Sequence, residues 1–301
     1  MYRTVVACIS ATAMLTVCGC ALFETPTDGR FRLPWASEEA VDPTVAVLPM
    51  ARLETLLVAR PTQDIRIRKL AWQELDESGV MAPERRRRLN DAGLRVGVAG
   101  GTVPWALQSL VRDEQENHST TGPLSSRRDL SASPQAFMGP EFSILEGGRT
   151  IIDLQSGIDA RHLPIDQIPE LEGLRSRENL RCVFEVTAKE LNDGWVLLSF
   201  LPQIHFGQAG IRFSVQGSMD QLPVRQDVMP LYDLQFSIKL HRGDTAVIGR
   251  MESPDWNLAR LYFQPGQEDR TSQEKLLMVR LVEIDEVRGQ RQTNVLMDFR
   301  D

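Results

Sequence analysis

Cysteine and histidine are scarce in this chain, and their positions exclude most metal and redox sites. Four of the 301 residues are cysteine and four are histidine. Cys8, Cys18 and Cys20 all fall within the first twenty residues, so Cys182 is the single cysteine in the rest of the chain. A structural zinc site needs four clustered cysteine or histidine ligands. The histidines are scattered, and we therefore predict no metal and no cofactor.

Familiar catalytic motifs are also missing. The sequence has no G-x-S-x-G nucleophile elbow and no H-E-x-x-H metal-binding helix. Cys182 lies in an alternating apolar segment, which predicts a small buried residue rather than a nucleophile. The remaining candidates have no spacing that specifies a site, and each is predicted to be a surface or packing residue. They are His205, His241, Asp227, Asp233, Asp244 and Glu252. We therefore expect no catalysis.

Positive charge is limited, which argues against a polyanionic partner. Lysine occurs four times and the formal net charge is −7. Binding to nucleic acid needs clustered positive charge, so no nucleic-acid partner is expected. The one basic run is Arg85-Arg86-Arg87-Arg88. On a helix these side chains point around most of the circumference, which predicts a solvated surface. Contact with a phosphate-bearing polymer or a partner protein is the alternative.

The glycine-rich segment is not predicted to bind phosphate. Residues 93–102 read GLRVGVAGGT, and one could imagine a phosphate cradle where a helix begins after Gly101. The spacing differs from G-x-G-x-x-G, and no Lys-Ser or Lys-Thr pair follows. A turn that leads into a capped helix is the favoured interpretation.

The chain has no apolar run long enough to span a bilayer comfortably. Arg3 is followed by a short apolar segment that ends at Val17, and turn-rich polar sequence begins at Glu24. This order of a positive residue, a short apolar run and a polar segment is typical of a secretory signal. A signal peptide is therefore predicted over residues 1–19.

The end of that run resembles the lipobox of bacterial lipoproteins, in which a small residue precedes the cysteine that is acylated. Val17-Cys18-Gly19-Cys20 fits with Gly19 before Cys20. Val17 is bulky before Cys18, so Cys18 is the second choice as acceptor. A redox pair lacks the spacing of a thioredoxin-type motif, and a plain secretory signal or membrane anchor remains the other alternative. The resemblance implies a membrane partner through the lipid on Cys20 and leaves Cys182 without a disulfide partner.

The resemblance also implies a place in the cell envelope. Residue 21 is Ala rather than the Asp that retains many lipoproteins at the inner membrane, so an outer-membrane anchor facing the periplasm is favoured. Residues 20–43 contain Pro26, Gly29 and Pro34 and show no period, which predicts a tether between the lipid and the folded part.

The rest of the chain is predicted to be α+β. A small α/β domain is expected over 44–112, with strands over 44–48, 53–59 and 94–98 and helices over 65–75, 83–92 and 103–111. A flexible linker is expected over 113–137. A β-rich domain, an antiparallel sandwich or partly closed barrel, is expected over 138–301. Its strand candidates include 142–145, 150–154, 180–187, 195–201, 211–215, 234–240, 245–248, 260–263, 276–284 and 294–297.

Two turns and one long connection complete the prediction. Asn192-Asp193-Gly194 and Arg242-Gly243-Asp244 each separate alternating segments and are predicted to be hairpins. Residues 157–179 are predicted to be a long polar connection.

One order of features in the C-terminal half resembles the secretins, outer-membrane gate proteins of bacterial export systems. Leu201-Pro202-Gln203-Ile204 resembles a secretin strand that ends in proline. Residues 236–249 resemble a secretin strand, glycine turn and Val-Ile-Gly strand, and residues 276–282 resemble a late strand. The resemblance covers under a third of the chain. It implies a shared β module but not a pore.

These observations together predict a binding or assembly function and no catalysis. We expect a lipid-anchored envelope protein that binds or assembles with another envelope protein. An accessory subunit of a secretin-type export complex is one alternative. An envelope hydrolase with a cleft between the two domains is the other, and it would need a histidine beside a carboxylate.

Overall fold

The structure is a computed structural model that describes residues 45–119, 139–174, 177–192, 194–211, 224–253, 255–265 and 272–290. The predicted signal peptide, Cys18, Cys20 and the predicted tether lie outside the described residues, as does most of the predicted linker. The chain divides into two units, Met1–Val45 and Ala46–Asp301.

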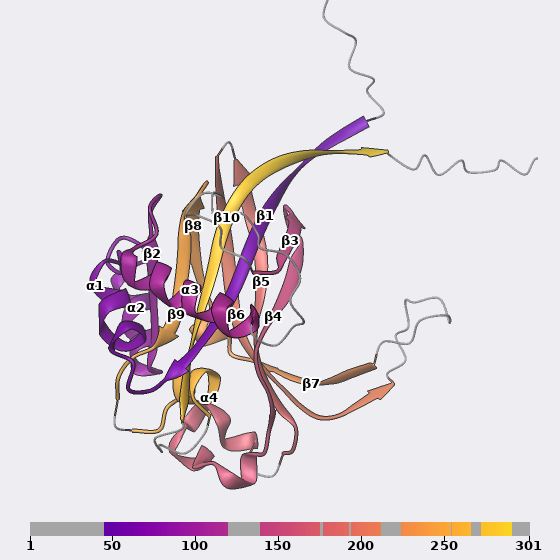
Figure 1. Cartoon of the computed structure of the whole chain (residues 1–301). Helices are drawn as coiled ribbons and strands as arrows, with labels where there is room; N and C mark the ends of the chain where they lie inside the picture. Colours follow the sequence, from indigo (N-terminus) through magenta and orange to yellow (C-terminus); the bar gives the residue numbers. More distant parts are fainter. Residues whose placement is uncertain are drawn as a thin grey trace, which may run out of the picture. The chain divides into compact units, whose positions relative to one another are not determined.

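Two antiparallel five-stranded sheets form the framework of the second unit, which confirms the predicted α+β class and its β sandwich (Figure 1). Sheet A has the order β2-β9-β10-β1-β3. Its strands are β1 Val45–Pro61, β2 Leu94–Ala99, β3 Glu141–Leu145, β9 Thr245–Arg250 and β10 Gln273–Gln290.

Sheet B has the order β4-β5-β6-β7, and β8 pairs with a different part of β6. β7 is bonded to the second half of β6, from Gln203 onward, and β8 to the first half, up to Phe200. The strands are β4 Arg149–Ile158, β5 Leu180–Asn192, β6 Trp195–Ile211, β7 Val224–Pro230 and β8 Phe236–His241.

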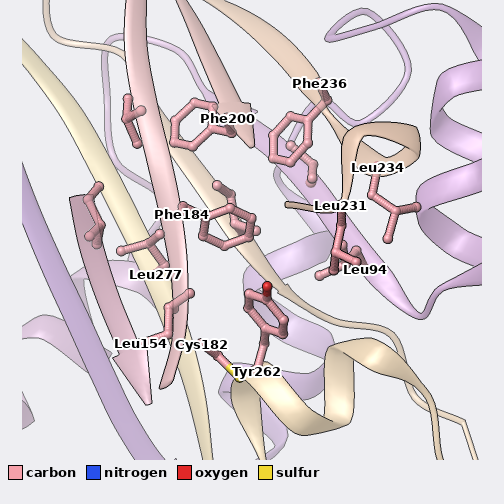
Figure 2. Packing of buried hydrophobic residues seen from close by; sticks show 14 of the residues in the cluster. Leu94, Leu154, Cys182, Phe184, Phe200, Leu231, Leu234, Phe236, Tyr262 and Leu277 are labelled. Atoms are coloured by element: carbon pink, nitrogen blue, oxygen red, sulfur yellow. The ribbon is translucent and has the colours of Figure 1, made fainter. Parts of the chain in front are cut away.

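The main core lies between the two sheets. Phe200 and Phe236 stack with ring centroids 5.2 Å apart, and Phe184 meets both rings edge-on (Figure 2). Tyr262 closes this cluster, and its hydroxyl donates to the Gln203 carbonyl at 2.9 Å. Offset and edge-on aromatic pairs add specific geometry to the burial of apolar area, so this cluster fixes how strands β5, β6 and β8 of sheet B pack against Tyr262.

Helices cover the other face of sheet A. They are the π-helix η1 Arg66–Leu70, the short helix α1 Ala71–Gln73 and the helix α3 Trp105–Ser119. Trp72, Leu107 and Leu110 pack there with Val58 of β1 and Met278 of β10. Alternate residues of β10 therefore face the helices and the sandwich core, as the two-residue period of a strand requires.

Three shorter helical segments border the sandwich. α2 Pro83–Asp91 begins at a proline and ends before Gly93, whose φ of +79° suits the residue that follows the C-terminus of a helix. α4 Leu258–Phe263 packs beneath the core, and the 3₁₀ turn η5 Tyr232–Leu234 joins β7 to β8. Leu94, Leu231 and Leu234 lie close together in Figure 2, where η5 packs against the strand that follows α2.

Strands from both predicted domains share sheet A. β1 and β2 come from residues 44–112, whereas β3, β9 and β10 come from residues 138–301. Residues 44–112 therefore contribute strands to a sheet that they share with residues 138–301. The pairing is long-range, which local sequence patterns do not record.

Two predictions about elements of the C-terminal half are wrong. Residues 260–263 belong to helix α4 rather than to a strand, because the Asn257 side chain accepts from the Arg260 amide at 3.0 Å and caps a helix. Residues 157–179 contain three 3₁₀ helices: η2 Ala160–His162, η3 Ile165–Gln167 and η4 Pro169–Leu174. Their apolar side chains are buried in the core rather than lying in a polar connection.

The two predicted hairpins have different outcomes. Asn192 pairs with Trp195, so the first turn joins β5 to β6 as predicted. The second turn is not a hairpin, since β8 belongs to sheet B and β9 to sheet A. Gly243 has a φ of +89° and the Asp244 amide donates to the His241 carbonyl. This turn therefore carries the chain from one sheet to the other.

Candidate binding surface on strands β1 and β10

The single cysteine of the described residues is structural. The Cys182 side chain is completely buried beside Tyr262. Burial raises the pKa of the thiol well above its ordinary value, and the charge of Lys275 only partly opposes this effect. A thiol that stays protonated and has no access to solvent is a poor nucleophile, in agreement with the sequence interpretation.

His205 lies on β6 with a neutral partner. Its Nε2 is 3.1 Å from Oε1 of Gln203, and the ring is 7% exposed. Burial lowers the pKa of the ring, and the charge of Arg181 lowers it further. Asp153 is bound by Arg181 through two contacts. Asp153, one of the two carboxylates whose charge acts on His205, is therefore already paired with an arginine, and the other is Glu185.

His241 and Asp244 serve the turn between β8 and β9. The Asp244 carboxylate accepts the His241 amide at 2.9 Å and the Gly101 amide at 3.1 Å. His241 stands opposite Trp195, ten residues along β6 from His205. At about 3.3 Å per residue the two histidines are roughly 33 Å apart, so they cannot share a site.

The other carboxylates named from the sequence are also dispersed. The Asp233 carbonyl accepts from Arg85 at 2.8 Å. Glu252 pairs with Arg68 at 3.4 Å. Asp227 of β7 stands opposite Phe206 of β6. Within the described ranges no group of three or more histidine, cysteine or carboxylate side chains could hold a metal ion.

The glycine-rich segment and the basic run have structural roles. The amide of Gly101, which a phosphate would have to reach, is bonded to Asp244. Arg85 and Arg86 are half-buried and donate to main-chain carbonyls, whereas Arg87 and Arg88 are exposed on α2. The four arginines thus divide between two faces of the helix, as the helical period predicts.

Strands β1 and β10 form an antiparallel pair that extends beyond the rest of sheet A (Figure 1). At one end of the pair, the Thr62 amide donates to the Ser272 carbonyl at 3.0 Å. Further along, Arg52 pairs with Glu283, which shows that the two strands stay side by side. Strands of 17 and 18 residues are long, since a typical strand has about 5–6.

Neighbouring strands cover only part of this pair. β9 pairs with β10 over Leu277–Arg280, and β3 pairs with β1 over Met50–Glu54. The next residue, Leu281, bonds to the β8–β9 turn. Among the described residues, β10 from Val282 onward therefore has β1 as its only neighbouring strand. An uncovered strand edge presents unpaired N–H and C=O groups to any chain that approaches.

Apolar side chains stand exposed on or beside this extension. The exposed fraction is 45% for Leu48 on β1, 41% for Leu145 on β3 and 38% for Val287 on β10. Pro49 follows Leu48, and a proline on an edge strand limits uncontrolled pairing on that side. The combination of a free backbone edge and exposed apolar side chains is typical of strand-addition sites.

The last third of β10 carries charges of both signs, with Glu283, Asp285 and Glu286 followed by Arg288. Glu283 is paired with Arg52, and Arg242 lies 3.9 Å from it. Asp285 and Glu286 make no ion pair with any residue the structure describes. The predicted strand ends at Ile284, because the charged residues that follow it end the apolar alternation, so the sequence pattern did not indicate this surface.

Comparison with known proteins gives little information about the family or function of this chain. No protein-family model and no curated protein matches it. One solved structure that matches is the Klebsiella pneumoniae type II secretion system outer membrane complex of PulD, PulS and the PulC HR domain. The identity is 11% and the TM-score 0.20, over 81% of this chain and 39% of that chain. This TM-score is too low to indicate a shared fold.

One further property bears on membrane attachment. None of the helices in the described ranges is long and apolar enough to cross a membrane.

Proposed function

We propose that this chain is a lipid-anchored protein of the bacterial cell envelope that binds another envelope protein and catalyses no reaction. The observation that carries the proposal is the β1–β10 extension, with its uncovered edge and exposed apolar side chains. Leu48 and Val287 lie on its two strands. A strand edge with adjacent apolar residues gives affinity through main-chain bonds and specificity through side chains.

The absence of catalysis rests on how the candidate residues are arranged. His205 contacts an amide, Asp244 holds a turn, and Cys182 is buried. The hydrolase alternative requires a histidine beside a free carboxylate in a cleft. The ring of His205 has the neutral Gln203 side chain as its partner, and Asp153 is paired with Arg181, which argues against it.

The anchor rests on the sequence alone. Val17-Cys18-Gly19-Cys20 resembles a lipobox, and Cys20 is the proposed acceptor. Acyl chains hold a protein at a membrane surface without a spanning helix. Attachment to the outer membrane, facing the periplasm, is the location we propose.

The anchor is tested by labelling cells with a clickable fatty acid. Label should be lost from the variant Cys20→Ala and kept in the matched variant Cys18→Ala. Retention of label and of membrane fractionation in Cys20→Ala would disprove the assignment of Cys20.

The binding role is tested in cells by placing a photo-crosslinking amino acid at Val287. A crosslink to one defined envelope protein is expected from Val287. The matched control is Ile151, which is 45% exposed but lies on β4, away from the extension. Equal crosslinking from both positions would count against the extension as the binding surface. The identity of the partner separates a secretin-type export complex from other envelope assemblies.

A further inference from the structure

We infer that residues 291–301 of this chain fold back as a strand on the uncovered edge of β10 and occupy it until a partner displaces them. Access to the β1–β10 extension is then controlled by the chain itself, and this control rests on the proposed function. A free strand edge is a liability that proteins commonly cover, and this chain carries a segment suited to cover its own.

Two exposed apolar side chains of the extension lie side by side. Arg52 of β1 contacts Glu283 of β10, so these two side chains are on the same face of the sheet. Leu48 lies four residues before Arg52, and Val287 lies four residues after Glu283. An even interval along a strand returns to the same face, so Leu48 and Val287 share that face and stand at the same level.

Strand β3 adds a third residue to this apolar face. Leu145 stands opposite Met50 in the pairing of β3 with β1, and Met50 lies two residues from Leu48. Leu145 is therefore on the same face as Leu48 and Val287, and all three are exposed. Beside Val287 the described strands leave one edge of β10 without a neighbour, so the apolar face ends at unpaired main-chain groups.

The sequence that follows β10 has the alternation of a strand. Residues 291–301 read RQTNVLMDFRD, and the strand predicted over 294–297 falls in this segment. The segment lies outside the described residues. Val295, Met297 and Phe299 recur at intervals of two, so one face of such a strand is apolar along its length.

The connection between the two strands has the length of a hairpin loop. β10 ends at Gln290, and residues 291–293 separate it from the predicted strand, which begins at Asn294. Antiparallel neighbours are commonly joined by about two to five residues. With Gln290 and Asn294 as the closing pair, Met297 stands opposite Val287. The apolar side of the segment then extends the apolar face of β1, β3 and β10 by one strand.

A segment of the same chain is favoured over a second copy. The short connection keeps residues 291–301 at the edge with an effective concentration of the order of millimolar. A second copy would need to reach that concentration in solution to compete. The added strand also pairs main-chain groups of β10 that no described strand pairs, which is the source of affinity in strand addition.

The same register makes the added strand displaceable. Asp298 stands opposite Glu286, and like charges directly opposite each other destabilise a strand pair. A partner strand without this like-charge pair can therefore replace residues 291–301 at the edge. The apparent affinity for the partner is reduced by the fraction of molecules whose edge is closed.

Hydrogen exchange of the full chain purified in detergent tests the contact. Amides of residues 283–287 should exchange slowly in the unmodified chain, because β10 is then paired on both edges. The variant Val295→Asp with Met297→Asp puts charge on the apolar side of the segment. In this variant the amides that face away from β1 should exchange at least about tenfold faster, while β9 keeps its protection.

The matched control is Asn294→Asp with Arg300→Asn. It changes the net charge by the same amount as the test variant, but on the other side of the strand. Residues 283–287 should exchange in this control as they do in the unmodified chain. Equal exchange of these residues in the test variant and the control would overturn the inference.

A photo-crosslinking amino acid at Val287 gives a second readout. In the purified chain it should crosslink to residues 291–301 of the same molecule, so the product keeps the mass of a monomer. In cells, Val295→Asp with Met297→Asp should raise the crosslink to the envelope partner by at least about threefold, because more molecules have an open edge.

The outcomes separate this inference from the proposed function. Fast exchange of residues 283–287 in the unmodified chain, or a crosslink from Val287 to a second copy, would overturn the inference and leave the proposed function standing. A protected edge that gives no crosslink to any envelope protein in cells, even in the test variant, would count against the proposed function while the contact of residues 291–301 with β10 stands. Protection that is lost in the test variant together with a stronger crosslink supports both.

Discussion

The ammonium group of Lys275 on β10 donates to the carbonyl oxygen of Leu154 on β4 at 2.7 Å. It also contacts the side-chain oxygen of Gln155. A side chain of sheet A thus bonds to the backbone of sheet B at the irregularity in β4 between Asp153 and Gln155. This contact holds the two sheets together at the edge of the aromatic core.

Replacing this lysine tests the inter-sheet bond. Lys275→Met keeps the length of the side chain but leaves the Leu154 carbonyl without its donor, which should cost about 1–3 kcal/mol. The free energy of unfolding is measured with urea. The exposed Lys189 supplies the control, since Lys189→Met should change that free energy by less than about 0.5 kcal/mol.

The aromatic cluster should be the most sensitive part of the core. Phe184 is 0% exposed and contacts Phe200, Phe236 and Tyr262. Phe184→Ala removes a large buried side chain and should destabilise the fold by about 3–5 kcal/mol. Ile151→Ala on the exposed side of β4 should have a small effect in the same urea titration. Similar losses in the two variants would contradict this description of the core.

Gly93 should not tolerate a side chain. Its φ is +79°, and a Cβ atom there would lie 2.4 Å from Nδ2 of Asn257, the residue that caps α4. Gly93→Ala should therefore cost at least about 1–2 kcal/mol from backbone strain alone. Gly173→Ala is the comparison, because a Cβ atom at Gly173 meets nothing within 4 Å. Thermal unfolding followed by circular dichroism distinguishes the two variants.

The buried carboxyl of Glu54 should make stability depend on pH. Burial raises the pKa of Glu54, although its carboxylate accepts the Gly139 amide at 3.0 Å. The folded state then holds the proton more tightly than the unfolded state, where the pKa is about 4.3. The resulting stabilisation is complete below the unfolded pKa and is lost as pH rises through the folded pKa.

This dependence is measured by comparing the unmodified chain with Glu54→Gln, whose side chain stays neutral. The stability of the unmodified chain relative to the variant should fall as the pH rises from about 4 toward neutrality. Glu146→Gln, at an exposed turn, serves as the control. A relative stability that rises with pH would show that the carboxylate is favoured in the folded state.

Cys182 should resist alkylation until the chain unfolds. Burial raises the pKa of its thiol and keeps reagents away. Iodoacetamide should therefore modify Cys182 in urea but not in native buffer, as measured by mass spectrometry of the peptide that contains it. Rapid modification of the native chain would show that the core opens there.

Local patterns in the sequence were sufficient to predict strands whose apolar and polar residues alternate, and turns that have clear turn residues. Residues 236–240 alternate and form β8, with Phe236, Ile238 and Leu240 buried. The pattern did not predict α4, because all six of its residues are buried and its apolar positions therefore show no helical period. Asn257 as an N-cap was the available signal for this helix.

A second signal was present in the segment predicted to be a polar connection. Ile165, Ile168, Leu171 and Leu174 follow one another at intervals of three residues, and all are at most 2% exposed. Three residues per turn is the period of the 3₁₀ helix. The assignment of β1 to the middle of sheet A had no such signal, because its neighbours come from distant parts of the chain.

The place of β10 in sheet A also determines when that sheet can form. Among the described strands of the sheet, β10 is made last, yet it lies between β1 and β9. The Arg52–Glu283 contact joins residues 231 positions apart. Until β10 joins the sheet, β1 and β9 lack the strand that lies between them, and each exposes an edge. Sheet A is therefore completed only when this last segment is available, and contacts of such long range predict slow folding.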